Sequence, residues 1–135
     1  MDDIPSGFER HFRKSPVTDP WEPLYSRREC SHFLLGLRIA TSHCNARGIL
    51  HGGVISALAD DALGLSCVVQ SEGMSALTVH LSTEFLSVGQ IGQWLEFRAE
   101  PIKVGRSIAF ARATVSADAN VIADATEIFK MIKRG

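Results

Sequence analysis

One segment of the sequence limits the choice of fold more than any other, the run from Val54 to about Gln70. It contains no proline and is rich in alanine and leucine, so it predicts a helix that ends before Gly73. Its large apolar side chains lie on every face of that helix: Val54, Leu58, Leu65, Val68 and Val69. A helix that is apolar nearly all round belongs in the interior of a domain.

Strands are predicted on both sides of this helix. Residues 31–41 alternate with a period of two, and four more alternating runs follow the helix at 76–86, 93–104, 106–116 and 121–133. We expect the last four to form an antiparallel meander. Because nothing else in the chain can cover the helix, the sheet must curl around it. The prediction is an α+β fold, with an antiparallel sheet wrapped around a long central helix.

The first thirty residues have a different character. They are charged and carry four prolines, with aromatic residues at irregular intervals. This pattern predicts a short amphipathic helix near residues 4–13, followed by an extended segment laid over the domain. We therefore divide the chain into an N-terminal extension, 1–30, packed on a domain of residues 31–135.

Composition excludes several classes of function. A chain of 135 residues is one domain, and a net charge of −1 argues against nucleic acid as a partner. The longest apolar stretch, 54–69, is interrupted by Asp60 and Asp61 and is too short to span a bilayer. The N-terminus has no apolar run of the kind found in a signal peptide, and three cysteines without CxxC spacing predict free thiols. We expect a cytoplasmic protein that binds neither membrane nor nucleic acid.

The candidate site begins in the turn before the helix. His51-Gly52-Gly53 places backbone N–H groups at the helix start, where unpaired donors favour an anion or a polarised carbonyl oxygen. Asp60 lies in a segment that is otherwise apolar, so its carboxylate must be paired, neutralised or used in chemistry as a general base or nucleophile.

The spacing of these groups has a consequence for assembly. Seven helical positions separate Gly53 from Asp60, which is about 10 Å along the axis. One reacting carbonyl cannot touch both groups within a single subunit. If they cooperate, they come from two chains related by a two-fold axis, with the helices antiparallel.

Each of these residues also has a purely structural interpretation. Asp60 could be a buried acid satisfied by Ser56 one turn back, or a surface acid on an exposed stripe, and Asp61 competes with it about 100° around the helix. Gly52-Gly53 could form only a tight turn, while His51 and Asn45 could be ordinary turn residues.

The combination Asn45-x5-His51-Gly52-Gly53-x6-Asp60 resembles the signature of the hotdog-fold acyl-CoA thioesterases. The similar branch contains the phenylacetate-pathway thioesterases and thioesterase superfamily member 2, and the resemblance covers roughly residues 31–133. It implies a hotdog fold, dimers and commonly tetramers. It also implies that Asp60 is the catalytic carboxylate and that Gly52 or Gly53 donates to the oxyanion.

The same resemblance implies supporting roles at this site. His51 would shape the turn, Asn45 would hold the thioester or the water, and Thr78 would orient water. Arg47, Lys103 and Arg106 are candidates for the CoA phosphates, as are the cations at the C-terminus: Lys130, Lys133 and Arg134.

The function expected from these observations is hydrolysis of a small or medium acyl-CoA, aromatic or aliphatic, to free acid and CoA. The proposed chemistry needs no metal and no cofactor, because the helix terminus supplies the electrophilic help and CoA is part of the substrate. Two alternatives remain: a non-catalytic acyl-CoA-binding hotdog protein, and a hotdog enoyl-CoA hydratase or dehydratase.

Overall fold

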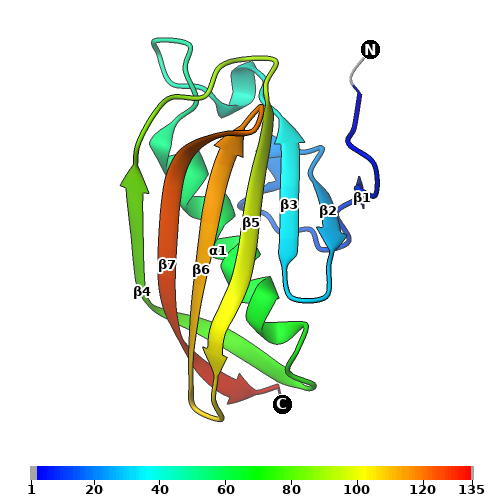
Figure 1. Cartoon of the computed structure of the whole chain (residues 1–135), viewed down its shortest axis with the longest axis vertical. Coiled ribbons are helices and arrows are strands. Elements are labelled where there is room, and N and C mark those ends of the chain that lie inside the picture. Colours follow the sequence, from blue (N-terminus) through cyan, green and yellow to red (C-terminus); the bar gives the residue numbers. More distant parts are fainter. Residues whose placement is uncertain (1–2, 135) are drawn as a thin grey trace.

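A single long helix lies against a seven-stranded antiparallel sheet in the computed structural model, which describes residues 3–134 (Figure 1). The helix α1 spans Gly52–Val68. The strands are β1 (Glu9–Arg10), β2 (Tyr25–Arg28), β3 (Phe33–Arg38), β4 (Met74–Phe85), β5 (Trp94–Val104), β6 (Ile108–Ala117) and β7 (Asn120–Lys133). Two short 3-10 helices, η1 (Asp19–Trp21) and η2 (Thr41–His43), lie in the connections.

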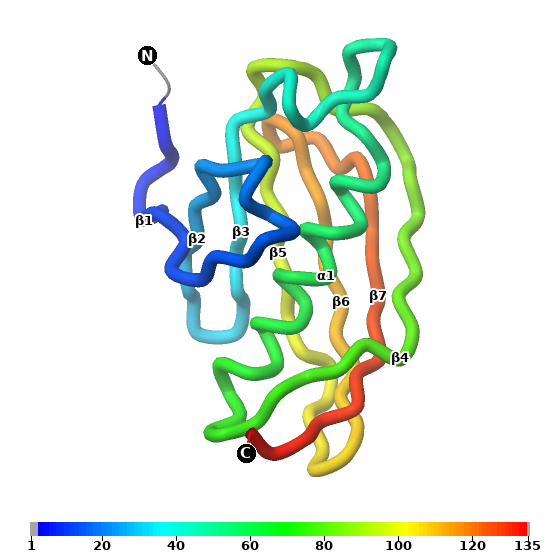
Figure 2. Tube along the Cα trace, turned by 180° about the vertical axis from the view of Figure 1, so that it is seen from behind, coloured from blue at the N-terminus to red at the C-terminus, as the bar shows by residue number. Residues whose placement is uncertain are grey.

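The prediction of a sheet wrapped around a central helix is confirmed. Nine residues of α1 are buried, from Val54 to Cys67, and all of them except Ser66 form one core with the inward faces of β3, β5, β6 and β7. The inward positions of β6 are mostly alanine, which lets the helix approach closely: Ala109, Ala111, Ala113 and Ala117. Seen from behind, α1 runs across the concave side of the sheet (Figure 2).

The strand order corrects one prediction. The order is β1-β2-β3-β5-β6-β7-β4, so β5, β6 and β7 form a meander but β4 pairs with β7 at the far edge of the sheet. The expected four-stranded meander is therefore wrong. Local alternation identifies strands but carries no information about which neighbour each one takes.

The predicted helix near residues 4–13 is also wrong. Residues 9 and 10 instead form β1, which pairs with β2, and β2 continues the sheet beside β3. The segment between β1 and β2 then reaches across β3 towards α1, on the face of the sheet that holds the helix (Figure 2). Isolated helix formation in so short a segment is weak, and pairing with an available strand edge replaces it.

Strand β3 is buried on both faces. Phe33, Leu35 and Leu37 face α1, whereas Leu34 packs in a second small cluster with Phe8 and Trp94. The indole of Trp94 lies over Gly36, where an added Cβ would come within 2.2 Å of its ring. The N-terminal residues thus cover an outer face that would otherwise meet water.

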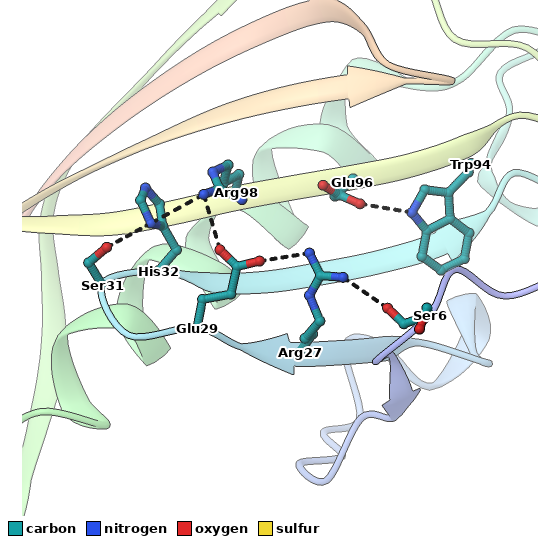
Figure 3. Close-up of polar contacts among 8 residues, drawn as sticks. All are labelled: Ser6, Arg27, Glu29, Ser31, His32, Trp94, Glu96 and Arg98. Carbon is teal, nitrogen blue, oxygen red and sulfur yellow. Dashed lines mark hydrogen bonds and ion pairs between the residues drawn. The ribbon is translucent and has the colours of Figure 1, made fainter.

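Polar contacts fasten the same edge of the sheet (Figure 3). Glu29, after β2, forms ion pairs with Arg27 at 2.7 Å and with Arg98 on β5 at 3.1 Å. Arg27 also donates to the Ser6 carbonyl at 2.9 Å. These contacts join the N-terminal segment, the β2–β3 hairpin and β5.

No helix within residues 3–134 is long and apolar enough to cross a membrane.

Candidate active site

Asp60 and Thr78 form the centre of the site. Asp60 lies in the middle of α1 and Thr78 lies on β4, and the Thr78 hydroxyl donates to Asp60 Oδ1 at 2.9 Å. The predicted pairing of Asp60 with Ser56 is not formed, because the Ser56 hydroxyl donates instead to Thr83 at 3.2 Å. The tertiary packing of α1 on the edge strand therefore brings together two groups that are eighteen residues apart.

These two residues open onto a cavity of about 360 Å³. Part of its wall is apolar: Leu65, Val68, Met74, Ala76 and Phe129. The N-terminal segment supplies another part through His11, Arg13, Ser15 and Val17. A carboxylate beside a partly apolar cavity of this size can act on the carbonyl of an acyl group held there.

Asp61 lines the same cavity. Burial, followed by the nearby charge of Asp60, raises the pKa of Asp61 to about 6, although Arg13 opposes both effects. No hydrogen bond of the kind that orients Asp60 is formed by Asp61 in the described residues. The geometry therefore separates the two adjacent acids and places Asp60, not Asp61, in the hydrogen-bonded position.

Glu127 is a functional candidate that the sequence reasoning missed. It lies on β7 with 1% of its surface exposed, and its Oε2 is 2.8 Å from Thr78 Oγ1. Burial, followed by the nearby Asp60, raises the pKa of Glu127 to about 9, although the contact with Thr78 lowers it. The sequence did indicate that Glu127 is buried, since the alternation of β7 places it on the same face as Ala125 and Phe129.

The turn that carries Asn45 is built by its own side chain. Asn45 Oδ1 accepts hydrogen bonds from the backbone N–H of Arg47 at 2.9 Å and of Ile49 at 3.3 Å, and Gly48 follows with a positive φ of 81°. The Oδ1 acceptor is thus occupied within the turn. These bonds do not use the Nδ2 donors of Asn45, which stay available to a ligand.

His51 distinguishes the two glycines that follow it. It is the N-cap of α1, and its Nδ1 accepts a hydrogen bond from the Gly53 N–H at 2.7 Å. The ring proton is therefore assigned to Nε2. Among residues 3–134, the Gly52 N–H has no hydrogen-bond partner, so Gly52 offers the free donor at the helix start.

The predicted site residues fall into two groups within the subunit. Asp60 and Thr78 lie at the cavity, whereas Asn45, His51 and the two glycines are not part of its wall. Gly52 is eight helical positions from Asp60, about 12 Å along the axis. The cations are similarly divided: Arg47 lies beside the turn before α1, while Lys103 and Arg106 lie at the β5–β6 hairpin at the opposite end of the sheet (Figure 1).

Comparisons with known proteins identify the family of the chain. A model of the thioesterase superfamily matches residues 47–123, more than half of the chain. A Pseudomonas aeruginosa protein described as a candidate esterase is 35% identical over 133 residues, covering 97% of this chain and 99% of that one. Mouse acyl-coenzyme A thioesterase 13 is 27% identical over 75 residues, which is 56% of this chain and 54% of the mouse protein, or about half of each.

The fold is similar to that of solved thioesterase structures. The crystal structure of zebrafish thioesterase superfamily member 2 superposes with a TM-score of 0.79 at 22% identity, covering 86% of this chain and 87% of that one. The resemblance carried by the Asn45 to Asp60 motif is thereby confirmed, and so is the hotdog fold. The chain belongs to the thioesterase superfamily, and its class of reaction is thioester hydrolysis.

Proposed function

We propose that the protein hydrolyses small or medium acyl-CoA thioesters to the free acid and CoA. The observation that carries this proposal is the hydrogen-bonded Asp60 carboxylate at the edge of a cavity of about 360 Å³. The volume is sufficient for an acyl group of modest size, aliphatic or aromatic. The name of the mouse relative, an acyl-CoA thioesterase, supports CoA as the leaving group.

In the proposed reaction, Asp60 either removes a proton from the water that attacks the thioester carbonyl, as a general base, or attacks that carbonyl itself, as a nucleophile. Attack converts the carbonyl oxygen to an oxyanion, which accepts a hydrogen bond from the Gly52 N–H at the positive end of α1. Collapse of the tetrahedral intermediate breaks the C–S bond, and the CoA thiolate leaves. If Asp60 is the base, it has taken a proton from the attacking water and the free acid forms directly; if Asp60 is the nucleophile, water then hydrolyses the anhydride that it forms with the acyl group. The reaction calls for no cofactor, since CoA is part of the substrate.

Assembly is part of the proposal. Asp60 and Gly52 of one subunit are too far apart to share one carbonyl, so we propose that each site combines Asp60 and Thr78 of one subunit with Asn45, His51 and Gly52 of its partner. The free edge of β4 supports this arrangement, because within residues 3–134 this twelve-residue strand pairs only with β7, and it includes Leu77 and Val79, which are 51% and 64% exposed. A second copy of β4 would satisfy the unpaired backbone groups of this edge. Pairing of two such dimers would give a tetramer.

Two further features belong to the proposal. Arg47, Lys103 and Arg106 are the candidates for the CoA phosphates, and a shared site would bring cations of one subunit close to the turn of the other. The three cysteines, Cys30, Cys44 and Cys67, are free, as suits a reducing compartment. We therefore propose a cytoplasmic location.

A thiol-release assay tests the proposed function. The purified protein is incubated with CoA thioesters and carrier-protein thioesters of varied acyl length and aromaticity, and free thiol is measured. We expect turnover of at least one CoA thioester and its loss in Asp60→Asn. Tight acyl-CoA binding without thiol release across the panel would instead identify a binding protein, and formation of an enoyl thioester would identify a hydratase.

A further inference from the structure

We infer that Glu127 is a positioning residue that acts as a neutral carboxylic acid, donating its proton to Thr78 Oγ1 so that the Thr78 hydroxyl donates to Asp60 Oδ1. This inference rests on the proposed function, in which Asp60 is the reacting carboxylate. It assigns a role to a residue of β7 that lies behind Thr78 and is not part of the cavity wall.

A count of protons supports the inference. Thr78 Oγ1 lies 2.9 Å from Asp60 Oδ1 and 2.8 Å from Glu127 Oε2, both within hydrogen-bond distance. A hydroxyl group carries one proton, so it can donate to only one of two ionised carboxylates. The other contact would then join two oxygens with no hydrogen between them. A proton on one of the carboxylates resolves the conflict.

Burial decides which carboxylate holds that proton. Glu127 is 1% exposed, whereas Asp60 is at the edge of an open cavity. The second oxygen of Glu127, Oε1, is buried without a hydrogen-bond partner in the described residues. This arrangement is far less costly for the carbonyl oxygen of a neutral acid than for one oxygen of an ionised carboxylate.

The charges around Glu127 favour the same assignment. From α1, the titratable groups that act on it or feel its charge are Asp60, Asp61 and Cys67. From β4 it meets Thr78, and its partner on β6 is Ala111. These neighbours include no cation. Burial and the two aspartates accordingly raise the pKa of Glu127 to about 9, above the pH of a neutral solution.

The direction of the hydrogen bonds has a mechanistic consequence. With Glu127 donating, the only proton of Thr78 is directed at Asp60 Oδ1, which fixes the rotation of that carboxylate and leaves Oδ2 to meet water or the thioester. Thr78 then orients the carboxylate rather than the water, in contrast to the role that the family resemblance implies for it.

Substitution of Glu127 tests this chain of donors. Glu127→Gln keeps a donor of similar size next to Thr78, so we expect kcat to stay within a few-fold of the wild-type value. Glu127→Leu fits a buried site but removes the donor, and we expect kcat to fall by about 10- to 100-fold, by analogy with the hydrogen-bond partners that orient metal ligands. Asp124→Asn, which removes an exposed carboxylate from the same strand, is the matched control and should change nothing.

The pH profile separates positioning from mere structural support. Ionisation of Glu127 reverses its hydrogen bond with Thr78, so wild-type kcat should fall above about pH 9. The glutamine variant cannot ionise, and its profile should lack this alkaline fall. A glutamine variant as impaired as the leucine variant would overturn the inference, because the carboxylate would then be acting through its charge.

A measurement without substrate keeps this inference distinct from the proposed function. The infrared spectrum at neutral pH should contain the carbonyl band of a protonated carboxylic acid, absent from Glu127→Gln. If that band is missing from the wild-type protein, the inference fails even when thioesters are hydrolysed. If the band is present and no thioester is hydrolysed, the proposed function fails while the assignment of the proton stands.

Discussion

Gly52 and Gly53 are adjacent in sequence but have different hydrogen-bonding roles. The Gly53 N–H is bound by the His51 side chain, and the Gly52 N–H has no partner among the described residues. Gly52 is also the first residue of α1, a position that accepts proline without breaking a helix, and His51 before it has the extended φ and ψ of −74° and 131° that proline requires. The proposed oxyanion donor can therefore be deleted without removing the helix.

We predict that Gly52→Pro lowers kcat by about 10²- to 10³-fold, because it removes a single N–H from the developing oxyanion. Gly52→Ala is the control, since it places a Cβ about as close to Phe85, 3.3 Å, but keeps the N–H. Steady-state kinetics of the two variants and circular dichroism of α1 make the comparison. Equal activity in both variants would transfer the donor role to another group.

The two adjacent acids of α1 should respond differently to substitution. We predict that Asp60→Asn lowers kcat by about 10³-fold or more, because the amide can neither accept a proton nor attack a carbonyl. Asp61→Asn, at a position whose charge is already disfavoured by burial, should retain most of the activity. Wild-type turnover in Asp60→Asn would remove this residue from the mechanism.

The buried Glu127 also predicts how stability depends on pH. Its pKa is about 9 in the folded protein and near the ordinary value of 4.5 when unfolded, so between these values the folded chain holds a proton that the unfolded chain has lost. Raising the pH therefore favours unfolding, by up to about 1.4 kcal/mol per pH unit for one proton. Above pH 9 both states have lost the proton and the dependence ends.

Urea denaturation at pH values from 6 to 9 measures this effect. Asp61, whose pKa is about 6, titrates at the start of this interval in both proteins, so the difference between the wild-type protein and Glu127→Gln isolates Glu127. We expect the free energy of unfolding of the wild-type protein to fall relative to that of the variant as the pH rises. Parallel curves would show that Glu127 is ionised in the folded protein.

The site could be predicted from sequence only where its residues form a local motif. The run from Asn45 to Asp60 supplied the turn, the helix start and the acid, and the family resemblance added Thr78. Glu127 was missed because its role arises from the pairing of β4 with β7, which brings it to Thr78 from 49 residues away. The partner of the Gly53 N–H likewise depended on a side-chain rotamer of His51.

At the scale of elements, the N-terminal segment connects stability with the cavity. Phe8 packs on Leu34 and Trp94 on the outer side of β3, and the chain that follows it carries His11 and Arg13 to the cavity wall. The local pattern predicted a helix in this segment because it contains no information about the edge of β2, with which residues 9 and 10 pair. It correctly predicted α1 and the strands after it, whose periodicity is set by burial against a single core.

We predict that Phe8→Ala lowers the free energy of unfolding by about 3 kcal/mol, the usual cost of removing a buried aromatic side chain. It should also raise KM for the preferred acyl-CoA, because the cavity wall formed by the same segment loosens. Phe12→Ala is the control: Phe12 is 64% exposed, so its removal should cost much less. Denaturation and steady-state kinetics of both variants check this link, and unchanged KM in Phe8→Ala would refute it.

At the scale of the whole molecule, the separation of Gly52 from Asp60 predicts complementation between inactive chains. In a mixed dimer of Asp60→Asn and Gly52→Pro, one site contains both substitutions and the other contains neither. Unfolding and refolding an equal mixture should therefore restore about a quarter of the wild-type activity. No restoration, despite mixed dimers seen by native mass spectrometry, would place a complete site within one subunit.

The length of α1 between Gly52 and Asp60 has a consequence for how such a protein can diversify. Because α1 fixes the interval between Gly52 and Asp60, insertions cannot change the geometry of the bond-breaking groups without destroying the core. The part of the N-terminal segment that carries Arg13 and Val17 is less constrained, since it forms cavity wall but lies outside that core. New acyl specificities are thus most accessible through exchange of this segment, a route open to natural variation and to directed evolution alike.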